Sequence, residues 1–187
     1  MKRPPRGDSI EKRPAEVDAR ETFGHWEGDT VYSKKDGSKA LFVLTERLTR
    51  EEIIVRIKDR TAESVVKALD RIERKCGPVL FRKIFRTITV DNGGEFSDVD
   101  RLERSALRKT LKRTKVYFCH PYSSYERGSN ECQNKMIRRP FPKGTDFGNV
   151  TDAEVARAES WMNNYPRKIL GWKTSEMLFR EYVAALI

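Results

Sequence analysis

The chain has 187 residues, of which 37% are hydrophobic and 35% are charged, and its formal net charge is +10. This composition suits one globular domain with an apolar core, and no apolar run reaches the roughly 20 residues that cross a membrane, so we expect no membrane partner. The positive excess favours a polyanionic partner such as nucleic acid, although a surface that only keeps the chain soluble would show the same sign.

The first 20 residues are rich in proline and charge and nearly free of apolar side chains. We expect them to form a basic linker or a disordered arm, with one domain over 21–187. They contain no apolar core of a signal peptide. The three cysteines are odd in number and form no Cys-x-x-Cys pair, which predicts free thiols, no zinc cluster and a reducing, cytoplasmic location.

Three β-like runs follow, over residues 23–33, 40–48 and 51–59. A turn signal at Asp36-Gly37 joins the first two runs, and the second join is short, so the three runs predict an antiparallel meander.

Helices and strands then alternate along the chain. Thr61 and Gly77 are the expected caps of an amphipathic helix over 61–77. Further elements are predicted as strand 85–90, helix 97–110, strand 115–119, a helix that starts near Ser129 or Asn130, and helices 152–164 and 174–186. The order predicts an α/β fold, with a mixed five-stranded sheet, helices on both faces and additional C-terminal helices.

Two aspartates stand at special places in these strands. Asp29 lies inside the first strand, where an acid is disfavoured unless it faces solvent, caps a turn or has a function. Asp91 ends the fourth strand and begins Asp-Asn-Gly-Gly, where it serves either a local Asx turn or a ligand site at the carboxyl end of a central strand. The sequence alone does not decide between a structural and a functional role for Asp29 or Asp91.

A third acid, Glu131, falls in the first turn of the helix that follows the last strand. By itself it only complements the helix dipole. In the predicted topology, however, the first and fourth strands are neighbours at the sheet centre, and the helix after the last strand begins across them. Asp29, Asp91 and Glu131 then converge, and like charges this close require cations. Oxygen ligands suit Mg²⁺ or Mn²⁺, and two such ions support phosphoryl transfer, so the three acids are candidate catalytic residues and metal ligands.

Residues 101–143 hold twelve Lys or Arg against three acids, a difference of +9, which is more typical of a binding surface than of general solubilisation. Part of this surplus lies on and beside the helix that carries Glu131. We expect its polar and basic side chains to contact DNA phosphates next to the metal site, although a solvated helix face is the alternative. The candidates are Arg127, Asn134, Lys135, Arg138, Arg139 and Lys143.

Four ordered blocks resemble one known family, the insertion-sequence-thirty family of bacterial DDE transposases in the ribonuclease-H-like integrase superfamily. The blocks are GHWEGDTV (24–31), TVDNGGEF (89–96), YFCHPYSSYERGSNECQNKMIRRPFPKGTDF (117–147) and NNYPRKILGWKTSEMLF (163–179). The resemblance implies a ribonuclease-H-like fold, and it implies that Asp29, Asp91 and Glu131 catalyse divalent-metal-dependent cleavage and strand transfer at transposon ends. It also implies a homodimer or higher multimer, DNA of transposon ends and target as partners, and a nucleoid-associated location in bacteria.

The sequence departs from the family in two places. The family separates its second aspartate from its glutamate by residues in the mid-thirties, whereas 39 residues separate Asp91 from Glu131 and 34 separate Asp91 from Glu126. We prefer Glu131 for its place at a helix start. Pro140 stands where a bulky residue is expected and predicts an early helix end. The family also has an upstream helix-turn-helix domain, which we do not recognise in this chain.

Two alternative functions remain open. One is a catalytically silent DNA-binding module from a decayed or truncated transposase. The other is a nuclease of ribonuclease-H type that cleaves RNA–DNA hybrids on the same fold.

Overall fold

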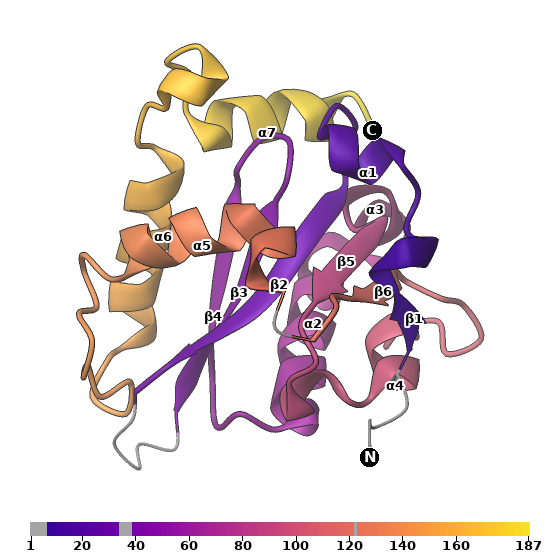
Figure 1. Cartoon of the computed structure of the whole chain (residues 1–187), viewed down its shortest axis with the longest axis horizontal. Coiled ribbons are helices and arrows are strands. Elements are labelled where there is room, and N and C mark those ends of the chain that lie inside the picture. The colour runs from indigo at the N-terminus through magenta and orange to yellow at the C-terminus, as the bar shows by residue number, and fades with distance from the viewer. Residues whose placement is uncertain (1–6, 34–38, 122) are drawn as a thin grey trace.

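The computed structural model describes residues 7–33, 39–121 and 123–187, without the side chains of residues 124, 125, 130 and 131. Within these residues, six strands form one mixed sheet in the order β1-β6-β5-β2-β3-β4 (Figure 1). The strands are β1 (Asp8–Ser9), β2 (His25–Tyr32), β3 (Ala40–Glu46), β4 (Glu52–Ile57), β5 (Thr87–Val90) and β6 (Lys115–Phe118).

The strand pairing follows the predicted topology. Strands β2, β3 and β4 form the antiparallel meander, and β5 pairs in parallel with both β2 and β6. The α/β mixed sheet with helices on both faces is therefore confirmed, with one strand more than the five predicted. The turn predicted at Asp36-Gly37 lies outside the described residues.

Two apolar clusters cover the two faces of the sheet. One cluster packs α2 (Ala62–Cys76) and α3 (Pro78–Ile84) against the sheet, with part of α7 (Ser175–Ala184) at its border. The other cluster packs α5 (Gly128–Ile137) and α6 (Asp152–Asn163), and Figure 1 shows these two helices together on one side. The sequence did not predict α3, which begins at Pro78 directly after α2.

Helix α2 forms as its sequence predicts. The side chain of Thr61 accepts a hydrogen bond from the N–H of Ser64 at 3.3 Å, which satisfies one of the free donors at the helix start. Val65 and Leu69 are fully buried on its inner face. Gly77 ends the helix with φ of +80°, a conformation that costs glycine little, so α3 can start at once.

The helix predicted over 97–110 is wrong beyond Glu103, where α4 (Val99–Glu103) ends. A helix would join the N–H of Ala106 to the carbonyl of Leu102. Instead, Ala106 donates to Oε2 of Glu73 at 2.8 Å, and Leu102 accepts from Nε of Arg113 at 2.9 Å. Both halves of the helical bond are taken by side chains from elsewhere, so the chain turns back and Arg104 pairs with Lys112.

Residues 7–20 differ from the disordered arm predicted over 1–20. Strand β1 pairs in parallel with β6, and α1 (Glu16–Ala19) buries Val17 almost completely. Arg13 is also buried and donates from Nη1 to Oγ1 of Thr89 at 2.9 Å. These contacts cover the edge of the sheet, so the ordered domain includes part of the segment predicted as a linker; residues 1–6 lie outside the described residues.

Candidate active site

Asp29 lies on β2, which has β5 on one side and β3 on the other. Its carboxylate is half-buried. Oδ1 accepts from the N–H of Thr30 at 2.8 Å, and Oδ2 accepts from Nδ2 of Asn134 at 2.9 Å. Because β2 is a central strand, the alternative of a solvent-facing acid on a sheet edge does not hold. Asn134, on α5, is the side chain that fixes one oxygen of Asp29.

Asp91 follows the last residue of β5 and uses its two oxygens differently. Oδ1 accepts from the N–H of Gly93 at 2.8 Å, which closes the Asx turn, and Oδ2 lies 3.1 Å from Nη2 of Arg127. Burial raises the pKa of Asp91, although the charge of Arg127 opposes the shift. The turn and a ligand role are therefore compatible at this carboxylate, since only one oxygen serves the turn.

The guanidinium of Arg127 lies between the two aspartates. Nη1 donates to the carbonyl of Gly28 at 3.0 Å and lies 3.5 Å from Oδ1 of Asp29, while Nη2 contacts Asp91. Burial alone would lower the pKa of Arg127, but Asp29 and Asp91 outweigh it and raise that pKa. One cation thus holds both carboxylates within its reach, where the end of β5 lies beside the interior of the parallel strand β2.

Glu131 is the fourth residue of α5, and its side chain lies outside the described residues. The helix begins at Gly128, slightly earlier than the caps predicted at Ser129 or Asn130. The competing acid, Glu126, is held by His120. Its Oε1 lies 2.7 Å from Nδ1, and its Oε2 accepts from the backbone N–H of the same histidine at 2.9 Å. Among the described side chains, no three potential metal ligands converge.

The other predicted DNA contacts lie on or just beyond α5. Lys135, Arg139 and Lys143 are exposed. Arg138 is the C-cap and donates from Nη2 to the carbonyl of Tyr32 at 3.2 Å. The helix ends at Ile137, ahead of Pro140, as the proline predicts.

Glu95 is a buried acid beside the site that the sequence reasoning missed. It is only 5% exposed, and its Oε1 accepts from Oγ1 of Thr30 at 2.6 Å and from Nη2 of Arg60 at 2.7 Å. Burial would raise the pKa of Glu95, but these two hydrogen bonds outweigh it and lower that pKa, which keeps the group ionised. The sequence signal that could have identified Glu95 was its position four residues after Asp91.

Gly93 explains how Glu95 approaches the turn. A Cβ atom at Gly93 would collide with the carboxylate of Glu95 and lie 2.9 Å from Oδ1 of Asp91. Only glycine leaves this room, so Gly93, the first of the two glycines in the turn, is needed for the close approach of Glu95.

These residues fit a hard divalent cation. Asp29 and Asp91 supply carboxylate oxygens, and a guanidinium already occupies a place between them. Oδ1 of Asn134 is buried and has no hydrogen-bond partner among the described residues. Oxygen donors of this kind are the ligands that Mg²⁺ and Mn²⁺ take. An open cleft of about 480 Å³ borders the site, lined by Asp91, Asn92, Gly93, Cys119, His120, Pro121, Ser123 and Arg127.

Residues 19–124 match the integrase core domain family, and the chain belongs to this family. Its relatives include the transposase of insertion sequence element IS4351 from Bacteroides fragilis, 35% identical over 93% of this chain and 50% of the relative. Transposase InsI of element IS30A from Escherichia coli is 35% identical over 95% of this chain and 43% of the relative. The resemblance to the insertion-sequence-thirty transposases is thereby confirmed, and the chain spans about half the length of these relatives.

Two solved structures share the fold. The catalytic core domain of BIV integrase matches with a TM-score of 0.60 and 15% identity, over 88% of this chain and 98% of that one. A simian T-cell lymphotropic virus intasome in complex with PP2A regulatory subunit B56 gamma matches with a TM-score of 0.64 and 17% identity, over 96% and 59%. Both support the ribonuclease-H-like architecture. Within the described residues, every helix is too short or too polar to cross a bilayer.

Proposed function

We propose that this chain is the catalytic core of a DNA transposase, which cleaves DNA strands at transposon ends and joins them to target DNA by phosphoryl transfer. One observation carries the proposal. Asp29 and Asp91 contact the same guanidinium at neighbouring parallel strands, in a chain of the integrase core family. Transposases with 32–35% identity support this choice of reaction.

In this proposal Asp29, Asp91 and Glu131 would hold a pair of Mg²⁺ or Mn²⁺ ions. Such ions activate the attacking oxygen and stabilise the leaving oxygen of a phosphodiester. Asn134 orients Asp29 through the hydrogen bond at 2.9 Å. Arg127 neutralises Asp29 and Asp91 in the structure, and it would have to move from its place between them for a cation to bind there.

DNA would lie along α5 and the segment after it. Lys135, Arg139 and Lys143 are exposed there, and exposed cations near a cluster of acids can grip the phosphates next to the reacting one. Asn134 and Arg138 complete this surface. Arg127 faces the two aspartates in the structure, so it would reach DNA only after it releases them.

The proposal concerns the core, because the chain spans about half of its relatives. We propose that residues 21–187, extended by the ordered part of the preceding segment, form this core. A helix-turn-helix domain that reads transposon ends would belong to the rest of such a protein. Assembly as a dimer or higher multimer is supported by the fold shared with an intasome subunit. Action on nucleoid DNA in the bacterial cytoplasm is supported by the bacterial relatives.

A cleavage assay with matched variants tests the function. We expect Mn²⁺-dependent nicking of a duplex that carries the transposon end, and its loss in Asp29→Asn, Asp91→Asn and Glu131→Gln, with DNA affinity retained. Glu126→Gln is the control and should keep activity. Full activity in Glu131→Gln together with its loss in Glu126→Gln would move the third ligand to Glu126.

The two alternatives give different results in the same assay. A silent DNA-binding module would bind the duplex but would not nick it with either Mg²⁺ or Mn²⁺. A ribonuclease-H-type nuclease would cleave an RNA–DNA hybrid in preference to the duplex. Asp29 and Asp91 are both present and both contact Arg127, which favours an active site over a decayed one.

A further inference from the structure

The basic surplus of residues 101–143 divides between two ends of the sheet. Strands β5 and β6 are parallel, and Thr87 pairs with Lys115 at their start while Val90 pairs with Phe118 at their end. The catalytic candidates follow the end of β5. The segment 104–113 precedes the start of β6, so it lies at the opposite end of these strands, about 10 Å or more away. The helix α5 accounts for only the later part of the surplus.

The segment 104–113 is firmly held on the domain. The N–H of Ser105 donates to the carbonyl of Leu111 at 2.9 Å, and Arg104 pairs with Lys112. Below it, the fully buried side chain of Arg113 contacts Oε2 of Glu73 at 3.0 Å, and Glu73 also accepts from Ser105. The cationic side chains of this segment therefore project from a backbone that is fixed to the domain.

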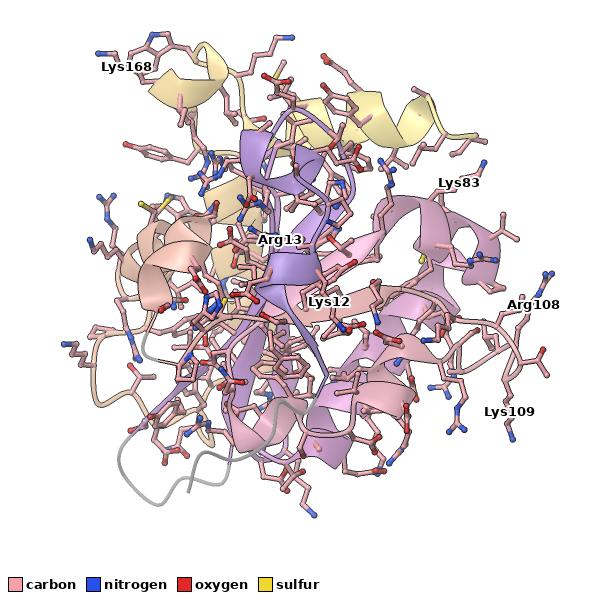
Figure 2. The ribbon with its side chains drawn as sticks, turned by 45° about the vertical axis from the view of Figure 1, so that its right-hand side comes forward. Lys12, Arg13, Lys83, Arg108, Lys109 and Lys168 are labelled. Atoms are coloured by element: carbon pink, nitrogen blue, oxygen red, sulfur yellow. The ribbon has the colours of Figure 1, made fainter. Side chains whose placement is uncertain are left out.

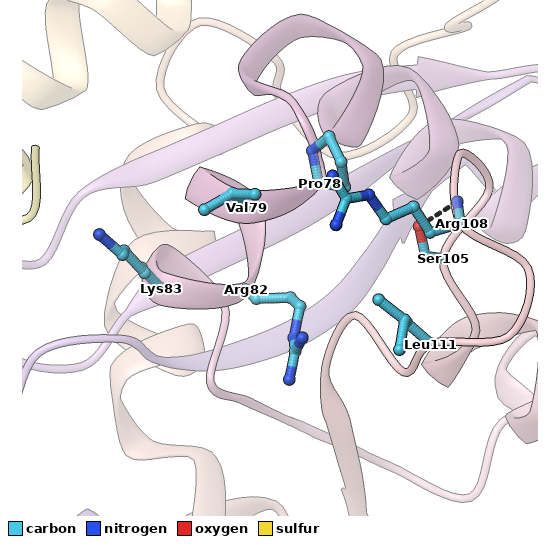
Figure 3. Close-up of a pocket in the computed structure, with 7 residues that line it drawn as sticks. All are labelled: Pro78, Val79, Arg82, Lys83, Ser105, Arg108 and Leu111. Atoms are coloured by element: carbon cyan, nitrogen blue, oxygen red, sulfur yellow. Dashed lines mark hydrogen bonds between the residues drawn. The ribbon is translucent and has the colours of Figure 1, made fainter.

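A groove of about 340 Å³ runs between this segment and α3. Arg82 and Lys83 stand on α3, and Arg108 stands on the opposite wall (Figure 3). The full lining consists of Pro78, Val79, Arg82, Lys83, Ser105, Arg108 and Leu111, so it contains three cations and no acid. Figure 2 shows Lys83, Arg108 and Lys109 projecting on the same side of the molecule.

Several of these cations lack a carboxylate partner. Within the described part of the chain, no ion pair involves Arg82, Arg108 or Lys109, whereas Lys112 lies 2.6 Å from Oε2 of Glu103 nearby. Unpaired charges of one sign on a single surface repel one another unless an anion joins them. The neighbourhood thus differs from an ordinary solvated face in which cations and acids alternate.

We propose that this surface, defined by Arg82, Lys83, Arg108 and Lys109, binds the sugar-phosphate backbone of a DNA segment apart from the reacting one. The inference rests on the proposed function, because that reaction brings two DNA segments together. The cations come from two chain segments and spread beyond the groove, which suits the repeated phosphates of a duplex. An acidic peptide anchored by its apolar side chains on Val79 and Leu111 is the competing occupant.

Binding of a labelled duplex of about 20 base pairs tests this surface in the full chain. The variant is Arg82→Glu with Arg108→Glu. The control is Lys58→Glu with Lys168→Glu, which changes the net charge equally at exposed positions elsewhere; Figure 2 places Lys168 far from Arg108. We expect the surface variant to lose at least about tenfold in affinity and to lower the salt slope by about 2, with much smaller changes in the control. Thermal melts check that both variants fold.

Two outcomes would overturn the inference. One is an equal loss of affinity in the surface variant and the control, which would indicate net charge alone. The other is unchanged DNA affinity in the surface variant. Lost binding of a labelled peptide of alternating glutamate and leucine would then assign the groove to an acidic partner. Failure of the proposed function is separate, because it shows as absent Mn²⁺-dependent nicking in the unsubstituted chain whatever the binding data.

Discussion

The molecule has two buried arginines that each lie between two acids. Arg113 belongs to the supporting part of the fold, and Arg127 belongs to the candidate site. Arg113 lies 2.6 Å from Oδ1 of Asp70 and 3.0 Å from Oε2 of Glu73. Its Nε and Nη2 donate to the carbonyls of Leu102 and Arg101 at 2.9 and 3.0 Å. All three nitrogens of this guanidinium are hydrogen-bonded, and the cluster ties α2 to the segment before β6.

Arg127 is buried like Arg113, but its hydrogen bonding is incomplete. Its carboxylate contacts are 3.1 and 3.5 Å, and its Nε has no partner among the described residues. Asn134, which holds Asp29, also keeps a buried oxygen without a partner there. Unmet hydrogen-bonding capacity is costly in a purely structural cluster. We infer that Arg127 and its two aspartates can change their contacts, whereas Arg113, Asp70 and Glu73 form a fixed structural cluster.

The largest effect should come from neutralising an acid at the Arg127 cluster. Asp91→Asn removes a proposed metal ligand, and metal ions supply several kcal/mol of transition-state stabilisation, so we expect strand cleavage to fall by about 10³-fold or more. The melting temperature should change little, because burial already disfavours the charge of Asp91. Cleavage rates and melts measure both, and activity within tenfold of the parent would contradict the assignment.

Breaking the Arg113 cluster should cost stability. Arg113→Met leaves Glu73 buried without its cation, and such losses are typically about 3 kcal/mol or more. Urea unfolding measures the change, and added Mn²⁺ should not restore it. A variant as stable as the parent would mean that Glu73 finds enough compensation in Ser105 and Ala106.

A buried acid without an arginine contact sharpens the comparison. Burial, with Glu176 and Glu159 nearby, raises the pKa of Glu51 to about 8. The folded chain keeps this group protonated at neutral pH, while in the unfolded chain it ionises near its ordinary pKa of 4.5. Its stabilising contribution is therefore full below pH 4.5 and is lost as pH rises toward 8.

Glu51→Gln removes this titration and retains an oxygen that can accept from Nδ2 of Asn163, as Oε1 does at 3.2 Å. We expect the variant to be more stable than the parent by about 3 kcal/mol at pH 7 and nearly equal to it at about pH 4. Urea unfolding at both pH values is the measurement. A constant difference across this range would show that Glu51 does not titrate as proposed.

The smallest effect should be Arg127→Met. Asp29 and Asp91 are partly open to water, with side-chain exposures of 19% and 41%, so we expect a loss of only about 1 kcal/mol without metal. Mn²⁺ should raise the melting temperature of this variant more than that of the parent, because no guanidinium competes for the acids. An Mn²⁺ shift equal to or below that of the parent would refute the proposed exchange.

Local sequence determined much of the framework. Helix α2 follows from Thr61, Gly77 and its apolar stripe, and the turn at Asp91 follows from Asp-Asn-Gly-Gly. The meander and the neighbouring position of β2 and β5 also followed from strand order and join lengths. These features depend on near neighbours in the chain or on the few topologies that short connections allow, so the residue pattern is sufficient to predict them.

Only the tertiary structure decided which charges meet. The pattern over 97–110 is helical, yet Glu73, distant in sequence, accepts from the amide of Ala106, and α4 ends at Glu103. Arg127 reads as a DNA contact in the sequence but faces Asp29 and Asp91 in the fold. The energy of a buried charge depends on partners brought in from distant segments, and spacing along the chain does not reveal them.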